Sequence, residues 1–467
     1  MRLVSHAIRR VCLTKVLYKE LEMVCSTLHR VFSAAIVLSV FVVGCGPPAR
    51  PVEEITTVPE EIPAAAPMAV GQNDWPWWRG AGRSNVAACK TAPTKWSESA
   101  NVVWKQSVPG RGHGSPTVAA DRVFLCTADE AAAKQYVVCF SRETGKQLWQ
   151  TEVHSGGLPD RGGMHPKSTH ANCTVACDGT SLFVGFLHSE HVQATSLTLD
   201  GDIRWQTEVG YFVPKFGYAA SPCLFESLVI YSGDNRGGGF LASVHRDTGD
   251  LVWRKARNDV DTYSSAIVAD IGGQSQLLIS GDDRVAAYDP LTGEDLWSCP
   301  GTASATCGTV VWKDNLVFAS GGYPARQTIC IDGKSGNKVW EDGVKCYEQS
   351  MLIVGDHLYA VTDDGIAMCW EAATGARQWR QRLSGPVSAS PVLVGNLIYA
   401  TNEAGTTWVF EANPEAYRQV AQNRLGSEAF ASFAVCNEQL FARVAAGNGP
   451  PRQEFLYCIG ETTAAAK

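Results

Sequence analysis

Histidine, cationic and aromatic side chains gather in a few short segments of the sequence. The segment from His154 to Ser168 contains Arg161, His165 and Lys167, and His170 follows it closely. Imidazole nitrogens can bind a metal ion, and cationic side chains beside aromatic rings can bind an acidic peptide or a glycan. We therefore predict a binding rim that contains His165, Lys167, His170, His188, His191, Tyr211, Lys215, Asp234 and Arg236.

The sequence gives little support for a catalytic or metal site. Histidines in long loops are usually solvated or hydrogen-bonded to backbone groups, so a rim without binding function is the alternative, and a metal site is less favoured than ligand or partner binding. Gly110–Pro116 is glycine-rich like a phosphate loop, but it lacks the Gly-Lys-Ser/Thr ending and precedes a predicted strand. The sequence contains no Gly-x-Ser-x-Gly elbow, no zinc-ribbon spacing and no Cys-x-x-Cys-His motif. We therefore predict no catalytic residue and no bound metal ion.

A repeat of glycine and tryptophan predicts the elements that must carry these residues. In six places a glycine stands four residues before a tryptophan, and successive tryptophans of this set are 56, 48, 44, 43 and 39 residues apart. Each interval matches the length of one four-stranded blade of a β-propeller. The pairs are Gly145 with Trp149, Gly201 with Trp205, Gly249 with Trp253, Gly293 with Trp297, Gly336 with Trp340 and Gly375 with Trp379.

One unit of the repeat reads as a meander of four strands. Ser350–Val354, His357–Thr362, Gly365–Glu371 and Arg377–Leu383 are β-rich runs separated by turn residues at hairpin spacing. Glycine suits the turn before the outer strand because such a turn commonly needs positive φ. The tryptophan four residues on can fill the gap between neighbouring wedge-shaped sheets. We therefore expect a blade-docking role for Trp104, Trp149, Trp205, Trp253, Trp297, Trp340 and Trp379.

The number of units predicts an all-β, eight-bladed propeller of four-stranded antiparallel blades. Val387–Arg424 forms a seventh unit with valine in place of the tryptophan, and Ser427–Gly460 supplies three strands of an eighth. Val102–Ser107 carries Trp104 without preceding strands, so this N-terminal strand is expected to pair with the C-terminal blade and close the ring. The alternative of separate β-sandwich domains predicts linkers, and none occurs between Trp104 and Gly460.

The propeller topology predicts that the rim residues are neighbours. In a blade built from the centre outwards, the turn between the second and third strands and the connection to the next blade emerge on the same face. His165 and Lys167 lie in one predicted connection, and Gly210–Phe216 is the next. His188–His191 and Asp234–Arg236 are predicted hairpin turns of the second and third blades on that face. Such loops commonly carry binding function.

The first 45 residues predict export. Val31–Val43 has the length of the apolar core of a signal peptide, and Val42-Val43-Gly44-Cys45 resembles a bacterial lipobox, whose cysteine is lipidated and becomes the first mature residue. We therefore expect residues 1–45 to be a signal peptide with lipidation at Cys45. Met23 lies 22 residues before Cys45, a normal length for such a signal, so it is a candidate for the true start. A cleaved secretory signal with an incidental cysteine is the alternative.

Further segments complete the predicted domain organisation. Residues 46–73 are rich in proline, alanine and glutamate without an apolar period, which predicts a solvated, extended tether. Residues 74–100 are expected to lead into a propeller at 101–460, and residues 461–467 are expected to be a disordered tail. Residues 46–467 contain thirteen cysteines, so at least one is unpaired or pairs with another chain.

Charge and hydropathy exclude some classes of partner. The 40 basic and 47 acidic residues give a net charge of −7, so nothing global attracts nucleic acid or an anionic membrane surface. The longest apolar run is shorter than the about 18 residues of a membrane-spanning helix, so we expect membrane contact only through the lipid anchor. Gly46 after the lipidated cysteine favours the outer membrane, with the protein facing the periplasm.

The repeats resemble those of the pyrroloquinoline-quinone-type (PQQ-like) propeller family. Arg142–Trp149 and Asp289–Trp297 show the Thr-Gly-x-x-x-Trp outer strand that marks the family. The resemblance covers about residues 75–460, and Asp74–Gly80 is similar to a segment of exported bacterial members. The resemblance implies the fold more strongly than a function.

The family resemblance implies two alternative functions. The large quinoprotein dehydrogenases of the family carry adjacent cysteines over the quinone and Glu, Asn and Asp calcium ligands, whereas this chain has no adjacent cysteines and is shorter. Other members are non-catalytic lipoproteins, such as the outer-membrane assembly factor B type. We therefore expect a scaffold without a cofactor that binds a protein or glycan partner in the cell envelope and no nucleic acid. A PQQ- and calcium-dependent oxidoreductase acting on alcohols or sugars is the alternative.

Overall fold

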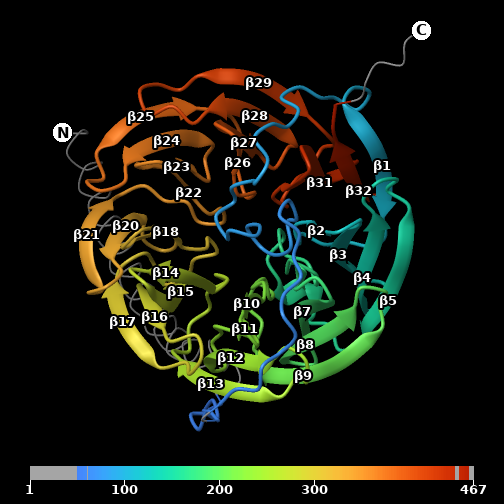
Figure 1. Ribbon diagram of the computed structural model, residues 1–467, viewed down its shortest axis with the longest axis vertical. Helices are drawn as coiled ribbons and strands as arrows, with labels where there is room; N and C mark the ends of the chain where they lie inside the picture. Colours follow the sequence, from blue (N-terminus) through green and yellow to red (C-terminus); the bar gives the residue numbers. More distant parts are fainter. Residues whose placement is uncertain (1–49, 60, 448–451, 462–467) are drawn as a thin grey trace, which may run out of the picture. The chain divides into compact units, whose positions relative to one another are not determined.

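Eight four-stranded antiparallel sheets form a ring in the computed structural model of the protein, which describes residues 50–59, 61–447 and 452–461 (Figure 1). Each sheet is one blade, with its first strand nearest the ring centre and its fourth strand at the outer edge. The predicted all-β, eight-bladed propeller is therefore confirmed. The described residues contain one helical element, the 3₁₀ turn η1 (Arg161–Gly163), and no helix among them is long and apolar enough to cross a membrane. Cys45 lies outside the described residues.

The first four blades follow one another along the chain. Blade 1 consists of β2 (Thr117–Ala119), β3 (Arg122–Asp129), β4 (Lys134–Ser141) and β5 (Gln147–Ser155), and blade 2 of β6 (Ala176–Cys177), β7 (Ser181–His188), β8 (His191–Thr198) and β9 (Ile203–Tyr211). Blade 3 consists of β10 (Cys223–Phe225), β11 (Leu228–Ser232), β12 (Gly239–His245) and β13 (Leu251–Arg257), and blade 4 of β14 (Ile267–Ile271), β15 (Gln274–Gly281), β16 (Arg284–Tyr288) and β17 (Asp295–Pro300).

The remaining blades continue around the ring, and the last one takes its outer strand from the N-terminal part of the chain. Blade 5 consists of β18 (Val311–Lys313), β19 (Leu316–Gly321), β20 (Gln327–Asp332) and β21 (Asn337–Asp342), and blade 6 of β22 (Leu352–Val354), β23 (His357–Val361), β24 (Ile366–Glu371) and β25 (Arg377–Arg382). Blade 7 consists of β26 (Val392–Val394), β27 (Leu397–Thr401), β28 (Thr406–Glu411) and β29 (Gln419–Arg424), and blade 8 of β30 (Ala434–Cys436), β31 (Gln439–Ala446), β32 (Gln453–Ile459) and β1 (Val102–Val108).

The burial of a strand depends on its place in the blade. A second strand such as β7 is covered by neighbouring blades on both faces, and all residues from 181 to 187 are buried. In the outer strand β5, residues 149, 151 and 153 are more buried than residues 148, 150 and 152. This alternation is expected where only one face of a strand is covered.

Each repeated tryptophan lies against the glycine turn of the following blade. A Cβ atom on Gly145, whose φ is +72°, would lie 2.6 Å from the ring of Trp104, and Trp104 Nε1 donates a 2.9 Å hydrogen bond to the Arg142 carbonyl of the same turn. Only glycine combines this positive φ with the close approach of the ring. The arrangement recurs for Trp149 with Gly201, Trp205 with Gly249, Trp253 with Gly293, Trp297 with Gly336 and Trp340 with Gly375, and Trp379 Nε1 donates to the Asn413 carbonyl of blade 7.

A ring of hydroxyl groups joins the blades around the centre. The Ser115 N–H of blade 1 donates to Thr174 Oγ1 of blade 2, and the Thr174 N–H donates to Ser221 Oγ of blade 3. Blade 8 joins blade 1 where the Ser432 N–H donates to Ser115 Oγ at 3.0 Å, and between blades 4 and 5 the Ser264 hydroxyl donates to the Gly308 carbonyl at 3.1 Å. This role explains the Ser-Pro pairs that precede several inner strands. The same bond joins Ser221 to Ser265, Thr309 to Ser350, Ser350 to Ser390 and Ser390 to Ser432.

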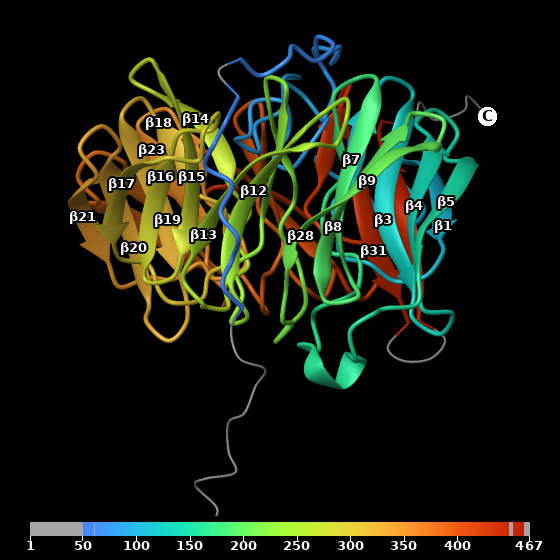
Figure 2. The same cartoon turned by 90° about the horizontal axis from the view of Figure 1, so that it is seen from below.

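The composition of the proline- and alanine-rich segment predicts a tether that is free in solvent. In the structure, the described part of this segment lies against the propeller instead. Figure 2 shows it running along the outer edge of blade 3 beside β12 and β13. Ile55 exchanges backbone hydrogen bonds of 2.9 and 3.1 Å with Arg254 of the edge strand β13. Val58 and Ile62 pack on the hydrophobic core between blades 3 and 4. Composition misses this contact because an open sheet edge binds backbone groups, which every residue except proline offers in full.

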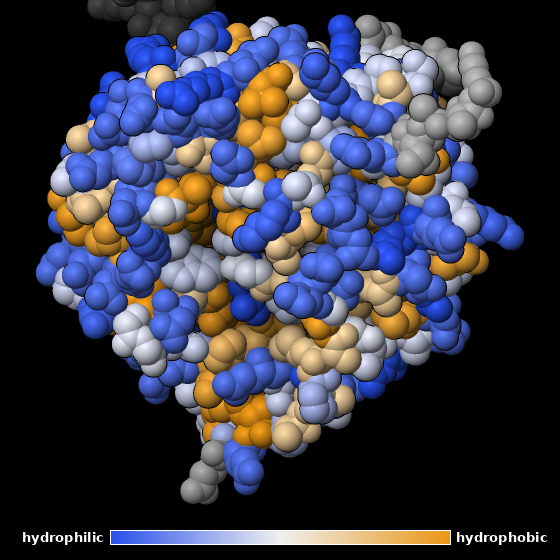
Figure 3. Space-filling view, turned by 45° about the horizontal axis from the view of Figure 1, so that its top comes forward, coloured by the Kyte–Doolittle hydropathy of each residue, from blue (hydrophilic) through white to orange (hydrophobic). Residues whose placement is uncertain are grey.

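The lead-in segment, residues 74–100, crosses the ring centre before it reaches β1. Trp75 forms a bridge with Val118 of blade 1, and Trp78 Nε1 donates to Thr309 Oγ1 of blade 5 at 2.9 Å. Asn85 then reaches blade 7, where its side-chain amide donates to a backbone carbonyl at 3.0 Å. The segment therefore closes one end of the centre. Figure 3, viewed partly from this face, shows hydrophobic groups interspersed among hydrophilic residues.

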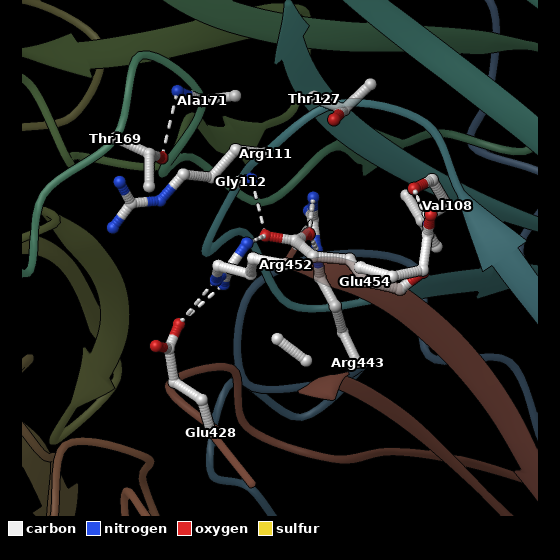
Figure 4. A network of polar contacts seen from close by, with 12 residues as sticks. Val108, Arg111, Gly112, Thr127, Thr169, Ala171, Glu428, Arg443, Arg452 and Glu454 are labelled. Atoms are coloured by element: carbon white, nitrogen blue, oxygen red, sulfur yellow. Dashed lines mark hydrogen bonds and ion pairs between the residues drawn. The ribbon is translucent and has the colours of Figure 1, made fainter. Parts of the chain in front are cut away.

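Ring closure places a buried ion network at the seam between blades 8 and 1 (Figure 4). The first strand of the fold, β1, pairs with the last, β32. Glu454 on β32 is 1% exposed and accepts hydrogen bonds from Arg443 Nε at 2.7 Å and Arg452 Nη1 at 2.6 Å. It also accepts from the Gly112 N–H at 3.1 Å, and Arg443 donates to the Cys126 carbonyl of blade 1 at 2.7 Å. These bonds tie the closing blade to blade 1.

The thirteen cysteines of the described residues are free thiols. Cys89 and Cys307 are partly exposed and the others are buried. The closest thiols, Cys126 and Cys173, have sulfur atoms 3.6 Å apart. Burial raises the pKa of most of these thiols, for example that of Cys139 to about 12. They therefore act mainly as small apolar side chains of the core.

Candidate functional site

A pocket of about 620 Å³ occupies the centre of the ring. Its walls come from the connections between blades and from the loop between β19 and β20. Trp78 of the lead-in segment lines the pocket from the other side. The ring hydroxyls also reach it, through Ser115, Thr174, Ser221, Ser265, Ser390 and Ser432.

Lys167 reaches across the pocket. It lies in the long connection between β5 and β6, and its Nζ is 2.5 Å from Glu403 Oε1 of blade 7 and 3.2 Å from Glu348 Oε1 of the connection between blades 5 and 6. Burial by itself lowers the pKa of Lys167, but the bonds and charges of Glu403 and Glu348 outweigh burial and raise the pKa. Lys167 is therefore protonated at neutral pH and fixes its connection over the ring centre.

The other two lysines of the pocket are also paired with carboxylates. Lys215 Nζ lies 3.6 Å from Asp261 Oδ2, and Arg236 Nε approaches the same oxygen at 3.3 Å. Lys345 Nζ lies 3.1 Å from Asp363 Oδ2. Among the described residues that line the pocket, every lysine thus has a carboxylate partner.

Aromatic rings form much of the remaining wall. Phe216 and Tyr323 are 38% and 67% exposed, and Lys215 Nζ lies over the Phe216 ring, 5.2 Å from its centroid. Phe216 packs edge-on against His165, with ring centroids 5.5 Å apart. On another wall, His113 and Phe430 stack with centroids 4.3 Å apart.

Two buried polar atoms of the pocket wall have no hydrogen-bond partner in the protein, His113 Nε2 and the Tyr263 hydroxyl. Burial, reinforced by Arg111 and Arg443, keeps the pKa of His113 well below its ordinary value, so the imidazole is neutral. Burial raises the pKa of Tyr263, which keeps its hydroxyl protonated. Neighbouring protein atoms cover both His113 Nε2 and the Tyr263 hydroxyl, so neither atom is open to the pocket.

The structure brings part of the predicted rim to this pocket and leaves part outside it. His165, Lys167 and Lys215 line the pocket, and Arg236 lies beside it on Asp261. His188, His191 and Tyr211 are not among the lining residues. They surround the hairpin of blade 2, where His191 Nε2 lies 3.1 Å from Glu208 and the Arg50 guanidinium covers the Tyr211 ring at 4.0 Å.

Two residues of the predicted rim are buried and have other partners. Asp234 is 5% exposed and binds Arg257 through both oxygens, at 2.6 and 3.0 Å. His170 is 8% exposed, and its ring nitrogens contact Glu130 at 3.2 Å and the Pro159 carbonyl at 3.0 Å. Neither residue lines the pocket. Turn position alone does not separate a buried ion pair from an exposed one.

Several lining residues were missed by sequence reasoning because they come from blades far apart in the chain. A signal does exist for them, since an aromatic residue or histidine stands two or three positions before a ring hydroxyl in several blades. Examples are His113 before Ser115, Tyr263 before Ser265, Tyr347 before Ser350 and Phe430 before Ser432.

The donor set of the pocket does not fit PQQ with calcium. Calcium takes six to eight oxygen ligands, several of them carboxylates. The pocket carboxylates Asp261 and Glu348 are each held by a cationic side chain. Over the residues that the structure describes, no group of three or more His, Cys, Asp or Glu side chains is arranged to hold a metal ion. No catalytic step through a quinone is therefore supported by these residues.

Comparison with known proteins agrees with the architecture. The BamB outer membrane protein assembly factor of Bordetella pertussis is 28% identical over 183 residues, 35% of this chain and 45% of that protein, so the match spans less than half of that relative. The BamB factor of Yersinia pestis is 24% identical over 357 residues, 72% of this chain and 81% of that protein. The quinoprotein alcohol dehydrogenase PedH of Pseudomonas putida is 25% identical over 229 residues, 48% of this chain and 36% of that enzyme.

A solved structure shows the fold of the chain, and a family match shows the family to which the chain belongs. The crystal structure of BamB from Moraxella catarrhalis superposes with a TM-score of 0.56 at 16% identity, covering 78% of this chain and 98% of that one, which shows the shared fold. The family described as outer membrane protein assembly factor BamB matches residues 80–210, 133–381 and 352–416. Because these matches span most of the propeller, the chain belongs to the BamB-type family of PQQ-like β-propellers.

Proposed function

We propose that this protein is a non-catalytic scaffold of the bacterial envelope that binds a protein partner during the assembly of outer-membrane proteins. The family membership supports this class of function. The pocket supports binding rather than redox catalysis, because its carboxylates are committed to lysine and arginine side chains. We include lipidation at Cys45 and attachment to the outer membrane on the periplasmic side in this proposal.

A loop that projects from one face of the ring and is braced by its own hydrogen bonds supports the proposal most directly. Figure 2 shows the connection between β5 and β6, with η1 at its tip, extending beyond the blades. Asp160 Oδ1 accepts from the Gly162 N–H at 3.0 Å, and Arg161 donates to the carbonyls of Ser168 at 2.5 Å and Pro166 at 3.0 Å.

The same loop leaves its tip open to a partner. Gly162, Gly163, His165 and Pro166 are exposed, whereas Met164 is buried beneath them. A loop held in one conformation loses little entropy when a partner docks on it. Binding loops on a rigid scaffold are typical of recognition sites. We therefore assign the partner contact to this connection, with Lys215 and Arg236 beside it.

Complementation in the bacterium that carries the gene tests the proposal. Deleting the gene should lower the amount of folded β-barrel protein in the outer membrane, measured by heat-modifiable mobility on gels, and the wild-type gene should restore it. The double variant Arg161→Ala/His165→Ala should fail to restore it, while Lys146→Ala, an exposed change in blade 1, should succeed. An unchanged level of folded β-barrels after deletion would count against the scaffold role.

Cell fractionation tests the proposed anchor separately. Cys45→Ala should move the protein from the membrane pellet to the soluble periplasmic fraction, because no other hydrophobic attachment is proposed. Cys25→Ala, a change in the same N-terminal region, should leave the protein in the pellet. A Cys45→Ala protein that stays with the membrane would contradict lipidation at this residue.

A further inference from the structure

The central pocket has a composition that the scaffold role does not use. It joins exposed aromatic side chains, paired charges and serine hydroxyl groups in about 620 Å³. We propose that the pocket binds a neutral sugar, a ligand with several hydroxyl groups and no net charge. This proposal goes beyond protein binding, and the partner loop supplies only part of the pocket wall, through His165, Lys167 and Ser168.

The charges of the pocket favour a neutral ligand. Lys167, Lys215 and Lys345 already have carboxylate partners at 2.5 to 3.6 Å. A ligand carboxylate would have to displace Glu403 or Asp261, and the released carboxylate would lose its partner in a partly buried site. An acidic peptide is disfavoured for the same reason. A neutral ligand leaves all of these pairs intact.

The hydroxyl ring adds donors that face the same space. Ser115 Oγ accepts from the Ser432 N–H and Ser221 Oγ accepts from the Thr174 N–H, so these oxygens are held in place by the backbone. Their O–H protons remain available to donate. Ring members from six blades line the pocket, so a ligand with hydroxyl groups along its edge can meet several of them.

The aromatic side chains supply the apolar part of the site. Phe216 and Tyr323 are partly exposed to solvent, and Trp78 is fixed by its bond to Thr309. Sugar rings carry flat patches of C–H groups, which pack on aromatic faces while their hydroxyls stay hydrogen-bonded. The volume falls within the range of about 300–1,000 Å³ that encloses small-molecule ligands.

Titration of the purified full-length mature protein tests this proposal. Methyl β-glucoside and N-acetylglucosamine are the neutral probes, and methyl β-glucuronide is the matched anion with the same ring. Calorimetry and tryptophan fluorescence should show saturable binding of a neutral probe. The glucuronide should bind about tenfold more weakly, because its carboxylate meets Asp261 and Glu348.

Exposed aromatic residues allow a variant that does not disturb the core. Phe216→Ala/Tyr323→Ala should weaken binding of the neutral probes about tenfold, because two stacking surfaces are removed. Leu148→Ala is the control, since Leu148 is 45% exposed on the outer strand β5. Gly163→Arg, a change at the exposed tip of the partner loop with open space around it, should keep sugar binding, so a failure of the partner loop is distinguishable from a failure of the pocket.

Three results would overturn the proposal. The first is the absence of saturable binding of both neutral probes at millimolar concentration to folded protein. The second is tighter binding of the glucuronide, or of an acidic peptide, than of the neutral sugars. The third is a Phe216→Ala/Tyr323→Ala variant that binds as tightly as wild type.

Discussion

Glu454 joins two arginines and a backbone N–H at the seam where the ring closes. Replacing it by glutamine removes the negative charge and leaves the buried Arg443 guanidinium without a counter-ion. The free energy of unfolding should fall by about 3–5 kcal/mol, which is typical when one partner of a buried ion pair is removed. Urea unfolding followed by tryptophan fluorescence measures this change.

An exposed ion pair provides the matched control for the change at Glu454. Glu341→Gln breaks the pair between Glu341 and Lys338 on β21, where both side chains are solvated. The midpoint of unfolding should hardly change, because solvent screens such pairs. If the two variants lost the same small amount of stability, the seam network would have no special role in closing the ring.

The lowered pKa of His154 should make the protein less stable in acid. Burial, together with the neighbouring His188, lowers the pKa of His154 to about 4. In the unfolded chain a histidine takes up a proton near pH 6.5, so between about pH 6.5 and 4 the unfolded state binds the proton and the folded state does not. Stability should therefore fall as the pH falls through this window. Between pH 7 and pH 4, the free energy of unfolding of His154→Phe should fall by about 1–3 kcal/mol less than that of wild type, as measured by urea unfolding at each pH.

The structure brings only part of the predicted rim to the pocket, for a physical reason. The sequence places His165, Lys167 and Lys215 in blade connections, and the structure puts them at the pocket. It places Asp234 in a turn as well, but Arg257 on the neighbouring strand draws that carboxylate into a buried pair. Such a pairing depends on tertiary contacts that turn chemistry does not encode. The ligand of the rim stays a prediction.

Gly293 shows why the blades could be read from the sequence. Its φ is +75°, and a Cβ atom there would lie 2.8 Å from the fully buried Trp253 ring. Gly293→Ala should lower the free energy of unfolding by about 1–2 kcal/mol for the left-handed backbone and by about 1–3 kcal/mol more for the crowding of the ring. Gly355→Ala isolates the first cost, because Gly355 has φ +57° with open space around it. Thermal unfolding should give a lower melting temperature for Gly293→Ala than for Gly355→Ala. The reverse order would count against the packing of the tryptophan ring on the glycine turn.

The position of the proline- and alanine-rich segment along blade 3 could not be predicted from the sequence. It is held by backbone bonds between Ile55 and Arg254, and its composition is that of a flexible linker. Ile55→Pro removes the donor of one bond and should speed hydrogen exchange at the Arg254 amide. Thr57→Pro, which places a proline two positions later, should leave the Arg254 amide protected from exchange. Equal exchange in both variants would show that the pairing does not hold the segment.

The whole ring was predictable because one packing solution is repeated around it. The glycine and tryptophan spacing reports the contact between successive blades, and the lone Val102–Ser107 strand reports the closure. The pocket was not predictable in the same detail, since its walls come from connections of several blades and from Trp78. Their meeting point exists only once the ring is closed.

In the whole molecule, the ring centre is proposed to be a recognition site and not a quinone active site. The most direct test is a titration of the purified protein with PQQ and calcium, following quinone absorbance and the dye-linked oxidation of alcohols and sugars. We expect no stoichiometric binding of the quinone at micromolar concentration and no turnover, because Asp261 and Glu348 are held by cationic side chains. Stoichiometric quinone binding with calcium-dependent turnover would contradict the claim and make the pocket an active site.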